Sequence, residues 1–365
     1  MGSRRNIFLY PFSLLYGLIT GFRNFLYNAE ILKSHTFPIP VICVGNLTAG
    51  GTGKTPLTEY LVSLLRGNFD VAVLSRGYRR KTRGFLFAGD SSRSEDIGDE
   101  PLQIARKFPG ITVAVDRKRV HGVCEILEKK PDSGVIILDD AFQHRSITPG
   151  YSILLSDFDR LMIYDRMLPY GNLRESIANM KRADIILITK SPETITPIQR
   201  RLIVKEIRKA PYQDLFFTSI TYKTPLPVFD NVKAEKDIFS RRGKEDSTGI
   251  VLVTGIANPK PLAGYLQKLT GEMINLPFGD HHRFSSSDFE KIMEAWKSLI
   301  SSRKYLITTE KDAVRIREFT NIAEAIRKAF YYIPVGIKFL NDNQEEFDNL
   351  IIEYVRKNKR NNRIS

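Results

Sequence analysis

The run VICVGNLTAGGTGKTPLTEYLVSLL occupies residues 41–65 and places three features in order along the chain. An apolar stretch typical of a buried strand comes first, a glycine-rich turn follows, and a Lys-Thr pair opens an amphipathic helical pattern. This order is that of a P-loop, in which backbone N–H groups and a helix N-terminus surround phosphates. Lys54 would then reach the β- and γ-phosphates of ATP, and the Thr55 hydroxyl would bind Mg²⁺.

The first position of the general pattern G-x4-GK-[ST] is Thr48 here instead of glycine. The glycines inside the turn supply the backbone freedom that the loop needs. A chance glycine-rich turn is the alternative, but the strand before it and the helix after it argue against that interpretation. We expect the nucleotide to contact the whole segment, which consists of Thr48, Ala49, Gly50, Gly51, Thr52, Gly53, Lys54 and Thr55.

Short β-branched runs alternate with helical patterns on both sides of this turn, which is typical of parallel strands joined by crossover helices. The strands are expected at residues 41–44, 71–74, 112–115, 135–138, 153–156 and 185–189, with helices at 56–65, 100–107 and 118–128. A second α/β pattern begins with a strand at 249–254 and continues with helices at 261–269 and 289–299 and a strand at 305–308. The pattern predicts an α/β fold with a P-loop NTPase-like, doubly wound, mostly parallel sheet and a second, smaller α/β domain.

The length of 365 residues and the 42% hydrophobic content also suggest about two domains. The expected division is an N-terminal hydrophobic helix, a P-loop kinase domain, a connector, a smaller α/β domain and a fraying basic tail. Their ranges are 1–30, 31–222, 223–248, 249–350 and 351–365.

The charge and cysteine content limit the function classes. A formal charge of +14 favours an anionic partner, which could be nucleic acid, an acidic membrane surface or a phosphorylated substrate. No helix-turn-helix, zinc-finger or RNP-like pattern supports nucleic-acid binding. The two cysteines form no pair or cluster, which argues against a disulfide scaffold or a zinc site and favours the cytosolic side of a membrane.

The N-terminus holds an uncharged apolar stretch at residues 6–22, flanked by Arg4, Arg5 and Arg23. The stretch is short for a spanning helix, which needs about 20 apolar residues. Its apolar residues recur at helical spacing, so we expect an amphipathic helix that lies in a membrane interface. A helix packed on the protein's own core is the alternative that the sequence leaves open.

Polar clusters follow several of the expected strands, where open α/β sheets bind ligands. VIILDDAFQHR (135–145) offers Asp139 or Asp140 to hold Mg²⁺, although two acids at a strand end could simply begin a turn. VLSRGYRRKTRG (73–84) is a basic loop suited to an anionic substrate or, equally, an ordinary solvated charge run. Further clusters are IGDEPLQIA (97–105), VDRKRVHG (115–122), LPYGNLRES (168–176), LPFGDHHRF (276–284) and LITTEKDAVRI (306–316).

Taken together, GNLTAGGTGKTP, LSRGYRRKTRG, GDEP, DDAFQHR, PYGNLRE, ADIILITK, DHHRF and TTEKDAVR resemble the tetraacyldisaccharide 4′-kinase (lipid A 4′-kinase) family in sequence and in order. The resemblance covers roughly residues 40–315, and Thr48 is in keeping with it. It implies transfer of the γ-phosphate of ATP, with Mg²⁺, to the 4′-hydroxyl of a lipid A disaccharide 1-phosphate. The location implied is the cytoplasmic face of the inner membrane of a Gram-negative bacterium, with no obligate protein partner.

The resemblance also implies roles for individual residues. Asp99 is the expected catalytic base and His281, directly after Asp280, its partner in preference to His282. Lys54 and Arg174 complete the expected catalytic set, and Thr55, Asp139, Asp140 and Glu175 are the expected metal-associated residues. The expected substrate residues are Arg76, Tyr78, Arg119 (in preference to Arg117), Gln143, His144 and Asn172. Closure of the two domains would complete such a site and exclude water.

A P-loop NTPase switch or a metallochaperone-like GTPase at the membrane is the alternative function, because ITK at 188–190 follows a strand. Pro192 stands where a guanine-reading aspartate would be needed, which argues against it.

Overall fold

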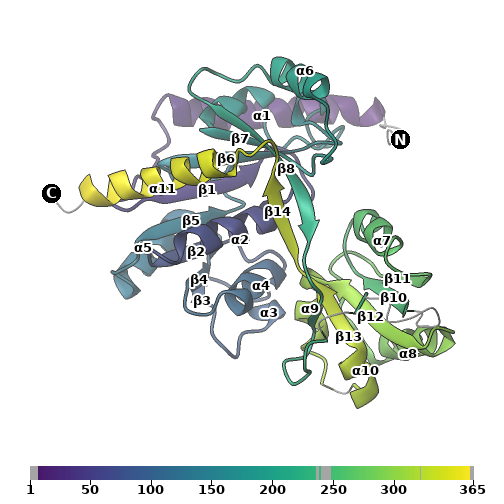
Figure 1. Cartoon of the computed structure of the whole chain (residues 1–365). Coiled ribbons are helices and arrows are strands. Elements are labelled where there is room, and N and C mark those ends of the chain that lie inside the picture. Colours follow the sequence, from purple (N-terminus) through teal and green to yellow (C-terminus); the bar gives the residue numbers. More distant parts are fainter. Residues whose placement is uncertain (1–6, 236–237, 240–247, 321, 362–365) are drawn as a thin grey trace. The chain divides into compact units, whose positions relative to one another are not determined.

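The computed structural model describes residues 7–235, 238–239, 248–320 and 322–361 (Figure 1). The chain divides into two compact units. Unit 1 consists of Met1–Ser91, Ile104–Thr221 and Gly336–Ser365, and unit 2 of Ser92–Gln103 and Tyr222–Val335. Arg4 and Arg5, part of the expected connector and the end of the expected tail lie outside the described residues.

The sheet of unit 1 has nine strands in the order β14-β8-β7-β6-β1-β5-β2-β4-β3. All the neighbours from β8 to β4 in this order pair in parallel, and β3 pairs antiparallel with β4. The strands are β1 (Val41–Asn46), β2 (Val71–Ser75), β3 (Leu86–Phe87), β4 (Thr112–Val115), β5 (Val135–Asp139), β6 (Tyr151–Asp157), β7 (Ile185–Thr189), β8 (Asp214–Tyr222) and β14 (Val335–Phe339). The glycine-rich turn follows β1, which lies between β5 and β6 in the middle of the sheet.

Both faces of this sheet are buried, which explains why its strands are apolar throughout. Along β1, Ile42 and Val44 pack on one face and Val41 and Cys43 on the other. The first face is covered by α2 (Lys54–Leu65), the end of α4 (Asp99–Lys107) and α11 (Gln344–Asn361), and the second by α5 (Arg119–Lys129) and α6 (Pro197–Ile207). Unit 1 also contains η1 (Ile7–Leu9), α1 (Tyr10–Asn28), η2 (Met162–Tyr164) and η3 (Ile177–Arg182).

Unit 2 has a five-stranded sheet in the order β11-β10-β12-β13-β9, parallel except for β9. Its strands are β9 (Leu226–Pro227), β10 (Thr248–Thr254), β11 (Glu272–Pro277), β12 (Arg303–Thr309) and β13 (Phe330–Ile333). Its helices are α3 (Ser94–Ile97), α7 (Lys260–Leu266), α8 (Ser286–Ser298), α9 (Glu310–Ile316) and α10 (Glu324–Ala329). α8, α9 and α10 cover one face, and α7 covers the other.

The expected fold class is confirmed, but the division of the chain differs from the expected one. Residues 92–103, which carry Asp99, belong to unit 2, although they were expected in the P-loop domain. Residues 336–365 return to unit 1. The prediction of a fraying end is wrong for the described part of the tail, because α11 continues to Asn361 and buries Ile351 and Val355 against the sheet.

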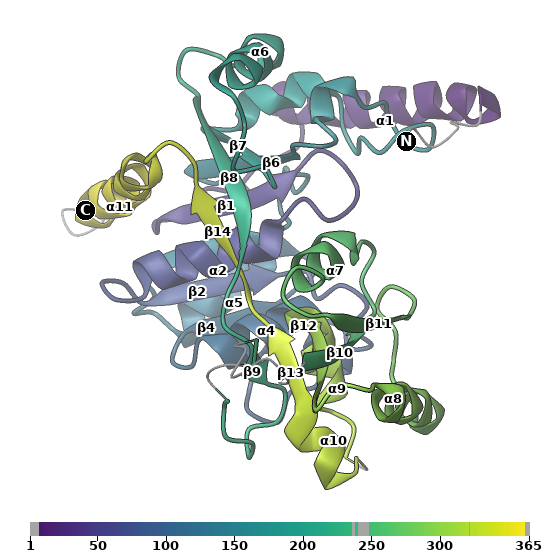
Figure 2. The same cartoon turned by 45° about the vertical axis from the view of Figure 1, so that its right-hand side comes forward.

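The expected N-terminal helix is present as α1 (Figure 2). Its apolar side chains are largely exposed. Within the described ranges, no helix combines the length and apolar character needed to cross a bilayer.

Candidate active site

The glycine-rich turn joins β1 directly to α2, which begins at Lys54. Gly50 and Gly53 have φ values of 110° and 86°, in the region where a side chain would be strained. Gly53 precedes the first residue of α2, so the turn ends at the helix N-terminus, where free N–H groups favour phosphate. The backbone therefore has the form that a P-loop requires.

Hydrogen bonds from two neighbouring elements fix this loop. The backbone N–H of Ala49 donates to the carbonyl of Asn172 at 2.7 Å. The hydroxyl of Thr189, at the end of β7, donates to the carbonyl of Thr52 at 2.8 Å. Lys190 donates to the carbonyl of Gly51 and lies 2.6 Å from Oδ2 of Asp157 at the end of β6. Two consecutive loop carbonyls are thus held by the last residue of β7 and the residue after it, a preorganisation that the ADIILITK pattern alone did not reveal.

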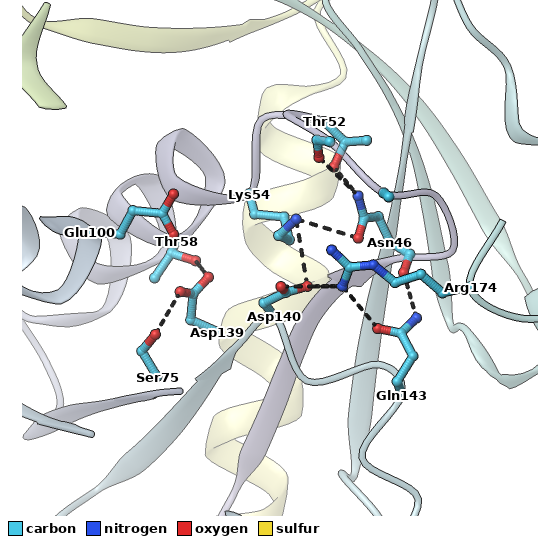
Figure 3. A network of polar contacts seen from close by, with 12 residues as sticks. Asn46, Thr52, Lys54, Thr58, Ser75, Glu100, Asp139, Asp140, Gln143 and Arg174 are labelled. Atoms are coloured by element: carbon cyan, nitrogen blue, oxygen red, sulfur yellow. Dashed lines mark hydrogen bonds and ion pairs between the residues drawn. The ribbon is translucent and has the colours of Figure 1, made fainter. Parts of the chain in front are cut away.

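Lys54 and Arg174 converge on the carboxylate of Asp140, as Figure 3 shows. The N–O distances to Oδ1 are 3.5 Å from Lys54 and 3.3 Å from Arg174, which also donates to Gln143 at 3.4 Å. Burial alone would raise the pKa of Asp140, but the two cations outweigh it and the pKa lies below its ordinary value. Asp140 is therefore ionised at neutral pH and holds two cations beside the P-loop.

Asp139 lies at the end of β5 and is almost fully buried. The hydroxyls of Ser75 and Thr58 donate to its two carboxylate oxygens at 3.2 and 3.4 Å (Figure 3). Among the residues that the structure describes, no group of three histidine, cysteine, aspartate or glutamate side chains is arranged to hold a metal ion.

Glu175, expected near the metal, has a different position. Its carboxylate is buried and accepts hydrogen bonds from Arg182, from Asn24 at 3.3 Å and from Arg23 at 3.5 Å. Asn24 and Arg23 belong to α1. In this position Glu175 joins α1 to the rest of unit 1, and its association with a metal stays a prediction.

Arg119, expected at the substrate, is also buried, with only 1% of its surface exposed. Its guanidinium donates to the backbone carbonyls of Asp116 and Asp139, and burial lowers its pKa to about 10. A side chain enclosed in this way positions the end of β5 and is not available to a substrate. Arg117, the other candidate, is exposed.

The remaining expected substrate residues have different surroundings. Arg76 and Tyr78 are exposed in the basic loop after β2, open to a ligand. Gln143 donates to the carbonyl of Asn46 at 2.7 Å, so it is held beside the P-loop. The side chain of Asn172 instead donates to buried Asp165 at 3.0 Å. Burial lowers the pKa of His144 to about 4, so this imidazole is neutral at neutral pH.

Unit 2 carries a separate polar cluster around Asp99, at the start of α4. Nδ1 of His281 lies 2.8 Å from Oδ2 of Asp99, and Nζ of Lys311 lies 3.0 Å from Nε2 of the same ring. An ammonium group has only donors, so Nε2 must accept and Nδ1 must carry the proton that is donated to Asp99. Burial would raise the pKa of Asp99, but the bond from His281 and the charge of Arg315 outweigh it and the pKa lies below its ordinary value.

The two neighbouring histidines have different surroundings. His281 has a φ of 60°, and its backbone N–H donates to the carbonyl of Gly255 at 3.1 Å. His282 stacks on Phe278 and pairs with Asp288 at 2.9 Å, at the start of α8. The structure thus places His281, and not His282, beside the expected base.

Lys311 and Arg315 are the residues that the sequence interpretation did not assign. Both lie on α9, four residues apart and hence on one face of the helix. Arg315 is buried, pairs with Asp312 and lies 3.8 Å from Asp99. The four-residue spacing of Lys311 and Arg315 in TTEKDAVR, at the end of a strand, was the sequence signal that could have identified these two residues.

Comparisons with known proteins identify the family of the chain. The family model described as tetraacyldisaccharide-1-P 4′-kinase (LpxK) matches residues 5–356. The tetraacyldisaccharide 4′-kinase of Bacteroides thetaiotaomicron is 45% identical over 361 residues, covering 98% of this chain and 95% of that protein. The corresponding protein of Flavobacterium johnsoniae is 42% identical over 350 residues, covering 96% and 97%.

A solved structure is similar along the same length. The crystal structure of LpxK from Aquifex aeolicus in complex with ATP superposes with a TM-score of 0.72 at 29% identity and covers 95% of this chain and 98% of that one. On these matches, the chain belongs to the tetraacyldisaccharide-1-P 4′-kinase family.

Proposed function

We propose that this enzyme transfers the γ-phosphate of ATP to the 4′-hydroxyl of a tetraacyldisaccharide 1-phosphate, a late step of lipid A biosynthesis. The observation that carries the proposal is the pairing of Asp99 with His281 in a protein that also has a complete P-loop. The P-loop accounts for the phosphate donor. An ionised carboxylate that accepts a hydrogen bond from a histidine can act as the base towards the hydroxyl of the acceptor.

The donor half uses residues of unit 1. Backbone N–H groups of the glycine-rich turn bind the phosphates. Lys54 and Arg174, which both form ion pairs with Asp140, neutralise negative charge on the transferred phosphoryl group. Thr55 and Asp139 are the residues that would hold Mg²⁺, and their hydroxyl and carboxylate oxygens are the donors that this ion prefers. When bound, Mg²⁺ supplies positive charge to the β- and γ-phosphates.

The acceptor half uses residues of unit 2. Asp99 accepts the proton of the sugar hydroxyl as the hydroxyl oxygen attacks phosphorus, and ADP leaves with the bridging oxygen. His281 donates its Nδ1 proton to Asp99 throughout and so orients the carboxylate. Lys311 keeps His281 in this tautomer from the opposite ring nitrogen. The phosphate-binding residues belong to unit 1 and the proposed base belongs to unit 2.

The membrane is the proposed location, at its cytoplasmic face. Each buried CH₂ of an acyl chain is worth about 0.8 kcal/mol, so removing a tetraacylated lipid from the bilayer would be costly. The exposed apolar side chains of α1, among them Leu15, Leu18 and Phe22, are suited to contact with the interface. Contacts of Tyr16 with the carbonyl of Arg174, and of Arg23 with that of Gln143, tie this helix to residues beside the P-loop.

The test is to incubate purified protein with γ-labelled ATP, Mg²⁺ and the disaccharide 1-phosphate dispersed in detergent. Label is expected in the lipid at the 4′ position. Label released only as inorganic phosphate, at the same rate with and without lipid, would instead favour the switch-like NTPase.

A further inference from the structure

Helix α6 exposes an apolar strip that the proposed kinase reaction does not use. Ile198 and Leu202 are 72% and 54% exposed, whereas Ile203 and Ile207 of the same helix are buried against the sheet. Residues four apart lie on one face of a helix. The two exposed side chains therefore share a face directed away from the core of unit 1.

The same face carries positive charge. Arg201, Lys205 and Arg208 are exposed, and the first two flank the apolar strip at helical spacing. The acid nearest to them, Glu206, accepts a hydrogen bond from the Tyr164 hydroxyl. Apolar side chains beside arginine and lysine are typical of helices that lie in the interface of an anionic membrane.

This face is continuous with α1 through the segment at residues 162–170. Tyr164 contacts α6 and is 59% exposed. Met167, three residues on, accepts a hydrogen bond from Ser13 of α1 at 2.7 Å. The Tyr170 ring packs edge-on against Tyr10 of α1, with centroids 5.5 Å apart. In both cartoon views α1 and α6 lie at the same end of unit 1 (Figures 1 and 2).

We propose that α6 is a second membrane-contacting element, in which Ile198 and Leu202 enter the headgroup region and the flanking basic residues bind anionic lipid headgroups. The proposal rests on the proposed membrane docking of α1 and extends it. Two contacts fix the orientation of unit 1 on the bilayer, whereas one helix alone leaves rotation about its axis free. The partner is an anionic lipid surface, because the exposed basic residues Arg201, Lys205 and Arg208 outnumber Glu206, the one acid of α6.

The test uses an environment-sensitive fluorophore attached to a single cysteine. Cys124 is exposed and is replaced by serine, while Cys43 is buried and does not label. Labels are placed by Ile198→Cys on α6, by Leu18→Cys on α1 and, as a control, by Ile300→Cys, which is 92% exposed in unit 2. With phosphatidylcholine vesicles that contain phosphatidylglycerol, emission is expected to shift to the blue at residues 198 and 18 and not at residue 300.

The outcomes separate the two proposals. A shift at residue 18 without one at residue 198 overturns the role of α6 and leaves docking through α1 standing. No shift at either position overturns both, and the detergent assay above still reports on the kinase reaction itself.

A second measurement tests the charges. Arg201→Gln with Lys205→Gln is expected to weaken binding to the anionic vesicles about 25-fold at low salt, because each basic residue near such a surface contributes a factor of about five. Binding to pure phosphatidylcholine and activity on detergent-dispersed lipid are expected to stay unchanged. The matched control is Lys291→Gln with Lys297→Gln, on the exposed side of α8. Equal losses in the two double variants would overturn the assignment.

Discussion

Nδ1 of His281 lies 2.8 Å from Oδ2 of Asp99, and the two residues are 182 positions apart in the chain. Since Lys311 occupies the other ring nitrogen, His281 donates to Asp99 and cannot itself accept the proton of an attacking hydroxyl. The histidine orients the carboxylate and helps to keep it ionised. Asp99 is left as the group that can act as the base.

Replacing Asp99 by asparagine tests this role. The amide keeps the shape of the side chain but cannot take a proton, so we expect kcat to fall by about 10²–10⁴. The Kd of ATP, measured by titration, is expected to stay within about two-fold of the wild type, because the P-loop belongs to the other unit. Asp230→Asn, at a highly exposed carboxylate of unit 2, serves as the control. A kcat near that of the control would show that Asp99 is not the base.

The orienting role of His281 can be separated from general structural support by two substitutions. His281→Asn retains an N–H close to the position of Nδ1 and is expected to keep much of kcat. His281→Ala removes the donor and is expected to lower kcat by about 10–100-fold with little change in the KM of ATP. If both variants lose activity equally, the N–H towards Asp99 is not what matters.

The lowered pKa of Asp99 predicts a particular dependence on pH. A free aspartate titrates near pH 3.9, and a carboxylate with a lower folded-state pKa contributes stability that is complete above that value. The contribution is lost as the pH falls through the folded-state pKa. We therefore expect the Tm difference between wild type and Asp99→Asn to be constant at neutral pH and to shrink below about pH 4. A difference that does not change with pH would contradict the ionised pairing.

Much of this site could be predicted from sequence, and the residues show why the remainder could not. The strand, turn and helix around Lys54 are contiguous, so periodicity and glycine placement sufficed. The burial of Glu175 and Arg119 could not be predicted, because a sequence motif does not distinguish a buried residue of an ion pair from a residue that binds a ligand. Their burial results from packing against α1 and from the end of β5.

The domain boundaries depended on long-range contacts that a local pattern does not contain. Residues 92–103 join unit 2, where Ser94 bonds Glu318 and Asp99 bonds His281. The basic residues that end the chain suggested a fraying tail, yet Phe347, Ile351 and Val355 recur at helical spacing and complete a face of the sheet in unit 1. This apolar spacing is present in the sequence, but the charged residues around it favoured the prediction of a fraying tail.

Lys190 connects the P-loop to the end of β6, and its loss should affect nucleotide binding. A hydrogen bond that involves a charged group contributes about 1.5–3 kcal/mol, so Lys190→Met is expected to raise the KM of ATP by about ten-fold or more. The KM of the lipid is expected to change little. Lys338→Met, at an exposed pair with Glu193, is the matched control. A KM for ATP equal to that of the control would mean that the loop keeps its form without Lys190.

Glu175 gives a test of how α1 is held. Glu175→Gln removes the charge that faces Arg182 and Arg23 and leaves these cations without their partner, at an expected cost of about 2–3 kcal/mol in the free energy of unfolding. The value lies below that of a fully buried pair because both arginines are partly exposed. Glu193→Gln, at an exposed ion pair, is expected to cost less than about 1 kcal/mol.

Loosening of α1 should also appear locally, because Asn24 and Arg23 join the helix to Glu175. Limited proteolysis is therefore expected to cut Glu175→Gln after α1 faster than the wild type, at a temperature where both are folded. Detergent-based activity should fall as well, since Tyr16 and Arg23 contact the backbone of Arg174 and Gln143. Thermal unfolding and cleavage rates like those of Glu193→Gln would show that α1 is held by its other contacts alone.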